Sequence, residues 1–495
     1  MNEARMPRPN MVSLLDGDPS VIFDVLIIGA GTAGLPCAIA AVDAGASVAL
    51  VEKSDRIGGT LHLSGGHFSA AATNRQRAYG IEDDSIEAHF NDVLRISEHT
   101  AREDIARKSV ELAPEMVDWL DENGFDFDPA TPRIVFGHEP YDTARTYYGA
   151  KEGRSLIEFF TPMIEARLAG GRLELRLQTS LADLILEDGA CVGVVVRRHD
   201  GTEEIIRARS IVLATGGYGA APKLFAELDG APLVSAAAMT STGDGLEIAR
   251  RHGAHVAGIG TYLPTFGGMP SPDDPERVQW VDRPLLVASE RVPWEIYVGP
   301  DGRRFVAEDE LSVDLKERAL TKVPTMTFHT IFDERAVSES SNIVVGWSAE
   351  DMRARAGIRP GVFVADTIEE LAAQADLPPD ALRRTVDAYN ASVDANYDAD
   401  FGRTAFPARI DHAPFYAMRN HGITLITFAG VDVDTQLQVR RPDGTVIDHL
   451  YGLGELLGSA AYMGNSFCSG MLVGPCISLG RELGARLAAN SSFPS

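Results

Sequence analysis

A glycine-rich turn near the start of the chain has the residue types that bind a diphosphate. Residues 29–34 read Gly-Ala-Gly-Thr-Ala-Gly and stand between an apolar strand pattern and a helix pattern. Gly29 permits the tight turn, Gly31 lets a pyrophosphate approach the backbone, and Gly34 lets the helix pack closely on the strand. The N–H groups at the helix N-terminus then face the phosphates. This arrangement predicts a dinucleotide site.

Further glycines extend the expected site beyond this turn. Residues 21–52 read as strand, helix and strand, and Glu52 ends the second strand, where a carboxylate can bind ribose hydroxyls. Gly-Gly-Thr at 58–60 and Ser-Gly-Gly at 64–66 follow, and Thr-Gly-Gly at 215–217 ends another apolar strand. Such backbone can lie against a long, flat ligand, whereas NAD domains usually continue directly into another helix. The combination favours FAD over NAD.

The elements that position these residues are predicted from their periodicity. Residues 81–124 are expected to hold two helices, and further helices are expected at 153–168 and 379–395. Residues 173–208 alternate between apolar and polar side chains, with turn residues at 188–189 and 199–201, which predicts a three-stranded meander. A separate apolar strand is expected at 210–215.

The length of 495 residues exceeds what one hydrophobic core usually holds, which predicts two domains. The middle of the chain is richer in proline and less regular than its flanks. We therefore expect a discontinuous FAD-binding domain at 21–261 and 414–490, with the meander inserted in it, and a second domain at 262–413. Residues 1–20 are expected to be a loose polar lead-in. The fold class is α/β, with an α+β second domain.

The charge of the chain argues against several classes of partner. Acidic residues outnumber basic residues by 71 to 45, giving a formal charge of −26, which disfavours nucleic acids and anionic membranes. The four cysteines have no CxxC spacing, so neither a metal site nor a disulfide framework is expected. No long apolar run or secretory signal is present in the sequence, which predicts a cytoplasmic protein without integral membrane association.

Longer motifs resemble those of the fumarate reductase and 3-ketosteroid 1-dehydrogenase flavoprotein superfamily. They are found in order at 23–66, 214–219, 241–254, 299–310 and 452–481. The resemblance implies a glutathione-reductase-like Rossmann domain that binds FAD, with an inserted capping domain that binds the substrate. It also implies hydride exchange between flavin N5 and a saturated carbon, coupled to proton transfer at the neighbouring carbon.

The same resemblance identifies expected cofactor contacts. The turn at 467–470 precedes an apolar helix, whose N–H groups would face the flavin N1/C2=O edge. The expected contacts are Gly29, Ala30, Gly31, Ala33, Gly34, Glu52, Lys53, Gly59, Thr60, Ser64, Gly65, Gly66, Ala214, Thr215, Gly216, Asp244, Glu455, Ser469, Gly470 and Met471.

The chain lacks the histidine that attaches flavin covalently in some members. That histidine stands six residues before a glycine pair, at the position of Gly59 in this chain, so noncovalent FAD is expected. His62 and His67 are expected to be packing or loop residues.

Two substrate-binding arginines of the dicarboxylate enzymes are also missing. One would stand four residues after Glu308, where this chain has Ser312, and the other would follow Asn465, where it has Ser466. A dianion would be poorly held without these cations, which argues against fumarate and succinate. The ketosteroid enzymes place tyrosines where Ser312 and Phe467 stand, so the catalytic set differs from theirs as well.

Several other groups remain candidates for proton transfer. Tyr147 and Tyr148 match a Tyr-Tyr stretch of the ketosteroid enzymes, which the chain therefore resembles more closely. Tyr462 could restore a phenol, His421 could act as a base near neutral pH, and Ser312 could orient substrate or water. The backbone N–H of Gly470 or Ser469 is a candidate oxyanion donor.

These features favour desaturation of the α,β-bond of a small-molecule ketone, cyclic or steroid-like, or the reverse ene reduction. Two alternatives stay open: an oxidase or dehydrogenase of a C–OH or C–N bond, and a non-catalytic flavin redox sensor. The electron acceptor is not indicated by any pattern in the sequence.

Overall fold

The computed structural model describes residues 22–231, 234–279 and 282–491. Its larger sheet has the strand order β15-β16-β8-β1-β2-β5, and β7 joins it through β8 while β6 pairs with β7. The strands of this sheet are β1 (Ile22–Ile28), β2 (Val48–Val51), β5 (Leu173–Arg176), β6 (Thr179–Glu187), β7 (Ala190–Arg198), β8 (Glu203–Leu213), β15 (Gln438–Arg440) and β16 (Val446–Gly452).

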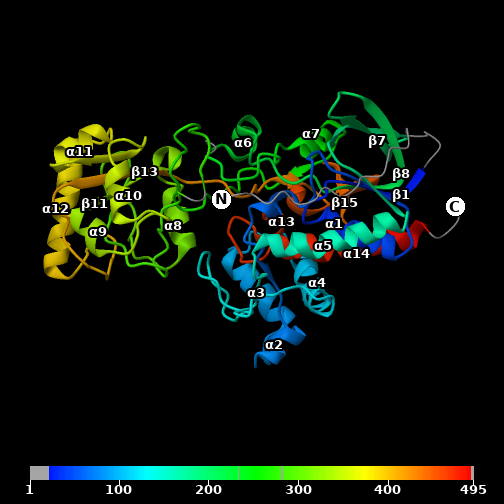
Figure 1. Cartoon of the computed structure of the whole chain (residues 1–495), viewed down its shortest axis with the longest axis horizontal. Helices are drawn as coiled ribbons and strands as arrows, with labels where there is room; N and C mark the ends of the chain where they lie inside the picture. Colours follow the sequence, from blue (N-terminus) through cyan, green and yellow to red (C-terminus); the bar gives the residue numbers. More distant parts are fainter. Residues whose placement is uncertain (1–21, 232–233, 280–281, 492–495) are drawn as a thin grey trace.

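The predicted strand–helix–strand unit is present as β1, α1 (Gly34–Asp43) and β2, with β1 parallel to β2. Strands β8 and β16 continue the parallel sheet, so that Ile28, Val51, Leu213 and Gly452 end at the same level. The turns that follow these four strands therefore meet at one edge, the usual ligand-binding edge of an open parallel sheet. Helix α14 (Val473–Ser491) packs against α1, and α1 also contacts α5 (Gly153–Ala169) (Figure 1).

Most of the predicted local elements are found. The two helices expected between residues 81 and 124 are α3 (Ile86–Ile96) and α4 (Glu103–Glu122), and α12 covers Pro379–Ala395. The meander is β6, β7 and β8, paired antiparallel. One detail differs, because the two strands expected at 204–208 and 210–215 form the single long strand β8. The first half of β8 pairs with β7 and its second half continues beside β1.

The smaller sheet has the order β10-β11-β13-β12 and lies in a separate lobe with α8 to α12 (Figure 1). Strand β13 (Phe415–His421) pairs antiparallel with β11 and β12, although a boundary at residue 414 would assign it to the first domain. The chain therefore returns to the larger sheet only after β13. The other elements of this lobe are β10 (Ile296–Val298), α8 (Val313–Leu320), β11 (Thr327–Asp333), α9 (Glu334–Glu339), α10 (Ala349–Arg355), β12 (Val362–Ala365) and α11 (Ile368–Gln374).

Short elements complete the fold around these two sheets. They are β3 (Phe68–Ser69), α2 (Asn74–Ala78), β4 (Thr146–Tyr147), α6 (Pro222–Asp229), α7 (Asp244–Arg251), β9 (Val256–Ala257), β14 (Gly430–Val431) and α13 (Ala460–Met463). In the described part of the chain, no helix combines the length and apolar character that crossing a bilayer requires. Within the same residues, no cluster of three or more His, Cys, Asp or Glu side chains is arranged to hold a metal ion.

Candidate functional site

A cavity of about 1110 Å³ lies where the turns after the parallel strands meet. The first sheet contributes the turns after β1, β2, β8 and β16, while residues 265–267 and 283–290 line the cavity from the side of the second lobe. The segment 133–138 and the residues preceding α14 complete the walls. The cavity is therefore long enough to continue from the predicted dinucleotide site into a chamber beneath the second lobe.

Most of the expected cofactor contacts line this cavity. Those that do are Gly29, Gly31, Ala33, Glu52, Lys53, Gly59, Thr60, Ser64, Gly65, Gly66, Ala214, Thr215, Gly216, Asp244, Glu455 and Gly470. Ala30, Gly34, Ser469 and Met471 are not among the lining residues. The Ala30 N–H donates instead to the Glu52 carboxylate at 2.9 Å, and Met471 is buried.

The three glycines of the first turn have different steric surroundings. A Cβ on Gly29 would lie 2.2 Å from the carbonyl oxygen of Ala214, and one on Gly34 would lie 1.8 Å from that of Gly29. A Cβ on Gly31 would meet only the Cα of Gly59, at 3.9 Å. Gly29 and Gly34 are thus required by the packing of the protein, whereas the space at Gly31 is open to the cavity. This open cradle fits the pyrophosphate of a dinucleotide.

Polar groups lie near Glu52, at the end of the cavity where the sequence predicts the ribose. Lys53 Nζ forms an ion pair with Asp244 at 2.9 Å and donates to the hydroxyl of Thr242. The hydroxyl of Thr215 is buried and has no hydrogen-bond partner among the described residues. It lies against α7, where a Cβ on Gly245 would come within 2.1 Å of it, so Thr215 packs the turn after β8 against this helix.

Glu455 has a second role that its motif did not predict. Its carboxylate accepts hydrogen bonds from the backbone N–H of Thr427 at 2.9 Å and from the Thr427 hydroxyl at 3.0 Å. Burial raises the pKa of this carboxyl, which the two Thr427 hydrogen bonds partly offset. Glu455 therefore ties the turn after β16 to the segment that ends at β14.

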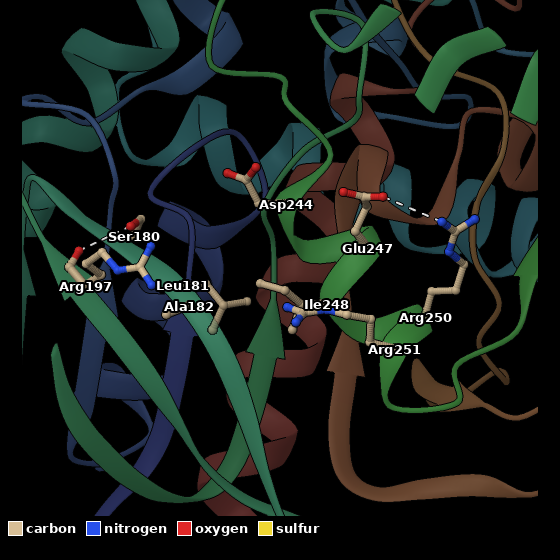
Figure 2. A pocket seen from close by; sticks show the side chains of 9 residues that line it. All are labelled: Ser180, Leu181, Ala182, Arg197, Asp244, Glu247, Ile248, Arg250 and Arg251. Carbon is tan, nitrogen blue, oxygen red and sulfur yellow. Dashed lines mark hydrogen bonds and ion pairs between the residues drawn. The ribbon is translucent and has the colours of Figure 1, made fainter. Parts of the chain in front are cut away.

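A smaller groove of about 390 Å³ opens beside the ribose end, between β6, β7 and α7 (Figure 2). Ser180, Leu181 and Asp244 line both this groove and the large cavity. Figure 2 shows Glu247 pointing toward Arg250, whose guanidinium lies 3.5 Å from it. Arg250, Arg251 and Arg197, which line the groove, each form an ion pair with an acidic side chain of the protein.

The opposite end of the cavity carries a group of apolar side chains beside charged ones such as Arg283 and Glu290. Leu285, Leu286, Leu425, Ile426 and Phe467 line it from both lobes. A planar hydrophobic molecule would therefore be desolvated at this end of the cavity.

Two polar side chains that the sequence analysis missed, Arg133 and His138, also line this chamber. Both belong to an irregular segment between α4 and β4 that carries no recognisable motif. Periodicity and motif matching give no signal in such a segment, so only the folded structure reveals them.

None of the three proposed tyrosines is among the residues that line the chamber. Tyr147 and Tyr462 are enclosed in the core, which corrects the prediction for both. Tyr147 is fully buried against Phe68, with ring centroids 6.0 Å apart, and its hydroxyl is bonded to Thr73 at 2.7 Å. Tyr462 is also fully buried and donates to the carbonyl of Gly454. Burial raises the pKa of both phenols, so both remain protonated packing residues.

His421 and Ser312 also lie outside the set of lining residues. His421 is in β13, where its Nδ1 is 3.0 Å from the Thr327 hydroxyl, and burial lowers its pKa to about 4. The hydroxyl of Ser312 donates to Glu139 at 2.6 Å and also caps helix α8 by accepting from the N–H of Leu315. Neither side chain is placed to act on a molecule in the cavity.

Tyr148 is the one proposed proton-transfer side chain that lies beside the chamber. Its ring contacts His67, with centroids 4.9 Å apart, and its hydroxyl accepts a hydrogen bond from Arg133 at 3.1 Å. Both of these neighbours line the cavity. Burial lowers the pKa of His67, so its imidazole forms a neutral part of the chamber wall.

The turn before α14 is held in place by buried hydrogen bonds. Tyr141 donates to the carbonyl of Ser469 at 2.6 Å, and the hydroxyls of Ser469 and Thr146 are 3.0 Å apart. Gly470 has φ +76°, and a Cβ there would lie 2.4 Å from the backbone nitrogen of Ser69. The turn therefore requires glycine at this position, and Gly470 borders the cavity at the chamber end.

The sheet, the open glycine cradle and the adjoining chamber define a dinucleotide-binding oxidoreductase with a mixed α/β fold. The profile of the FAD binding domain family matches residues 24–472, so the chain belongs to this family and FAD is its cofactor. It is a flavoprotein oxidoreductase of the fumarate reductase superfamily.

Individual relatives extend this assignment. A probable fumarate reductase, Ifc3, of Shewanella frigidimarina is 28% identical and covers 96% of this chain and 76% of its own length. The open conformation of a flavocytochrome c3 fumarate reductase matches with TM-score 0.74 and 27% identity, over 96% of this chain and 79% of that one. A 3-ketosteroid delta1-dehydrogenase from Sterolibacterium denitrificans matches in fold, with TM-score 0.76 and 21% identity over 95% and 100%.

Other relatives differ in length and in the compounds they are named for. The chain spans 47% of an NADH:acrylate oxidoreductase of Vibrio harveyi and 44% of an NADH:fumarate oxidoreductase of Klebsiella pneumoniae. More distant relatives are named as vinyl phenol, urocanate and digoxin reductases.

Proposed function

We propose that this protein is a FAD-dependent oxidoreductase of CH–CH bonds, which reduces a C=C bond conjugated to a ketone or catalyses the reverse desaturation. The observation that carries the proposal is the single cavity that joins the glycine cradle at Gly31 to an apolar chamber. Relatives named for reducing fumarate, vinyl phenol and urocanate support the class of reaction.

Backbone groups of the glycine-rich turns, together with the Glu52 side chain, would bind the cofactor. Gly31 and Gly59 leave room for the pyrophosphate, Glu52 would accept from ribose hydroxyls, and the turn at Gly470 would face the flavin ring. Bound FAD would supply the hydride exchange at the β-carbon of the substrate.

The substrate end favours a molecule without two carboxylates. Each of the two serines that replace arginines is hydrogen-bonded to a carboxylate, Ser312 to Glu139 at 2.6 Å and Ser466 to Asp314 at 2.5 Å. Neither serine lines the cavity or supplies the cation of the dicarboxylate enzymes, and the arginines that do line it, Arg133, Arg277 and Arg283, come from other segments. The apolar walls at Leu425 and Ile426 suit the hydrocarbon part of a cyclic ketone.

Proton transfer to the α-carbon is assigned to the hydroxyl of Tyr148. Its neighbour Arg133 donates a hydrogen bond to the phenol oxygen and would stabilise the negative charge left when the proton departs. Tyr147 and Tyr462 are excluded from this role because their hydroxyls are bonded within the core.

Reoxidation of the reduced holoenzyme tests the proposal. The flavin is reduced anaerobically with dithionite and mixed separately with 2-cyclohexen-1-one, 4-androstene-3,17-dione, urocanate and fumarate, while the flavin absorbance is followed. We expect an enone to restore the oxidised spectrum and to yield the saturated ketone. Reduction of the oxidised flavin by an alcohol or an amine, with no enone able to reoxidise the reduced flavin, would replace the proposal with the alternative reaction class.

A further inference from the structure

We propose that His138 is a catalytic residue, whose Nε2–H donates a hydrogen bond to the carbonyl oxygen of the substrate. This assignment rests on the proposed function, since it presumes a conjugated ketone in the chamber. His138 would take over the role of the tyrosine hydroxyl that related ketosteroid enzymes carry where this chain has Phe467.

The position of the imidazole supports this role. The ring of His138 stacks on that of Phe467, with centroids 5.2 Å apart and planes inclined by 19°. Phe467 in turn packs edge-on against Phe428, with centroids 5.5 Å apart, so the platform under the imidazole is fixed. His138, Phe467 and Gly470 all line the chamber, which brings the imidazole and the Gly470 turn to one region.

The hydrogen bonds that are missing around His138 indicate which nitrogen carries the proton. Nδ1 is buried and has no hydrogen-bond partner among the described residues. A buried N–H without an acceptor is rarer than a buried lone pair without a donor, so the hydrogen belongs on Nε2. Since Nδ1 is shielded, Nε2 is the atom left to meet a molecule in the cavity.

The charge of the His138 ring fits a hydrogen-bond donor rather than a proton donor. Burial, and to a smaller extent His67, lowers the pKa of His138 to about 4, so the ring is neutral at pH 7. Because the ring is neutral, it needs no counter-ion in an apolar chamber, and its N–H forms a hydrogen bond only when the substrate oxygen binds. As a hydride reaches the β-carbon, negative charge develops on the conjugated oxygen, and a fixed N–H there lowers the barrier.

The segment that carries His138 is fastened on two sides. Glu139 accepts a hydrogen bond from Ser312 of the second lobe and forms a backbone bridge to Cys468, next to Phe467. Ser312, where related enzymes have a catalytic group, is thus a positioning residue for His138 in this chain. The hydrogen bond between Ser312 and Glu139 thus joins the second lobe to the segment that carries the imidazole.

The test compares His138→Phe with His138→Gln in the FAD-loaded enzyme. Phenylalanine keeps the stacking on Phe467 but has no N–H, whereas glutamine retains an amide N–H donor. For the enone that the wild type reduces fastest, His138→Phe should lose about 10²–10³-fold in kcat with unchanged FAD content, and His138→Gln should recover at least tenfold of that loss. His421→Gln, a histidine change outside the cavity, should remain within about twofold of the wild type.

A binding measurement separates this inference from the proposed function. Cyclohexanone and 4-androstene-3,17-dione are titrated into the oxidised holoenzyme, and their Kd is read from the change in flavin absorbance. His138→Phe should weaken binding about tenfold, the value of one hydrogen bond to a neutral donor. Failure of every enone to reoxidise the flavin would contradict the proposed function. The role of His138 would be overturned if the wild type bound no ketone, or if the wild type and His138→Phe had equal ketone affinities or equal rates.

Discussion

A Cβ at Gly34 would lie 1.8 Å from the carbonyl oxygen of Gly29, so α1 can begin beside β1 only with glycine at that position. Gly31, between them, has no such neighbour within 3.9 Å. We therefore expect Gly31→Val to fold normally and to be purified without FAD, because its side chain would fill the pyrophosphate space. Circular dichroism measures the folding of the variant, and flavin absorbance measures its FAD content. Gly34→Ala should instead reduce soluble yield, and a folded, FAD-free Gly34→Ala together with a yellow Gly31→Val would contradict the assignment.

Acid precipitation should release the FAD into the supernatant. Gly59 stands where covalently flavinylated members have histidine, and neither His62 nor His67 replaces it in the sequence. The nearby cavity wall is largely backbone at Ser64, Gly65 and Gly66, which can hold a flavin only by noncovalent contacts. Absorbance of the supernatant at 450 nm and fluorescence of the denatured polypeptide measure the partition. Flavin fluorescence that stays with the polypeptide on a denaturing gel would refute this prediction.

Fumarate and succinate should be neither substrates nor tight ligands. Ser312 and Ser466 stand in place of the two arginines and are hydrogen-bonded to the carboxylates of Glu139 and Asp314. A dianion would therefore lack the two cations that offset its desolvation, at a cost of several kcal/mol. Stopped-flow reoxidation of the reduced enzyme compares fumarate with the best enone. Equal rates with fumarate and with the enone would show that another cation in the chamber binds the carboxylates in place of the two missing arginines.

The tyrosine hydroxyls should differ sharply in their effect on the rate. Tyr148→Phe should lose about 10²–10⁴-fold in kcat with unchanged FAD content, because it removes the proton donor and keeps the ring. Tyr147→Phe and Tyr462→Phe are matched controls, since each removes a hydroxyl that is bonded within the core, to Thr73 and Gly454. Their rates should stay within a few-fold of wild type, at some cost in stability. A normal rate for Tyr148→Phe would assign proton transfer to solvent or to another group.

The folded protein should lose stability as the pH falls below 6.5. Burial, then Arg145, lowers the pKa of His89 to about 3, and burial, then Arg419, lowers that of His329 to about 3. These histidines bind protons near pH 6.5 in the unfolded chain but not in the folded chain. The stabilisation from keeping them neutral is therefore fully present above pH 6.5 and is lost as the pH falls toward 3. The free energy of unfolding should decrease by about 1.4 kcal/mol per pH unit for each such histidine. Thermal unfolding from pH 7.5 to 4.5 should show a falling midpoint, with a shallower slope for His89→Gln. A midpoint independent of pH over this range would mean that these histidines do not stay neutral.

The sequence alone determined the parts of this protein that depend on local pattern. The strand–helix–strand unit at β1, α1 and β2, the meander of β6 to β8, and α12 follow from periodicity and from turn residues, which act over a few residues. The glycines at 29, 31 and 34 can be recognised in the sequence because each position requires glycine, either for close contact with neighbouring backbone or to leave room for the ligand. The two strands expected at 204–208 and 210–215 merged because a single long strand can pair with β7 and β1 in turn.

Tertiary structure decided which polar groups reach the chamber. Tyr147 and Tyr148 are neighbours in sequence, and alternate side chains of a strand point to opposite faces. Only the pairing of Tyr147 with Phe68 settles that Tyr147 enters the core, while Tyr148 lies against His67. His138 comes from a segment without periodicity, and its place over Phe467 is set by contacts between residues more than three hundred positions apart. Such long-range packing leaves no pattern in the nearby sequence, so the residues that line the chamber are seen only in the fold.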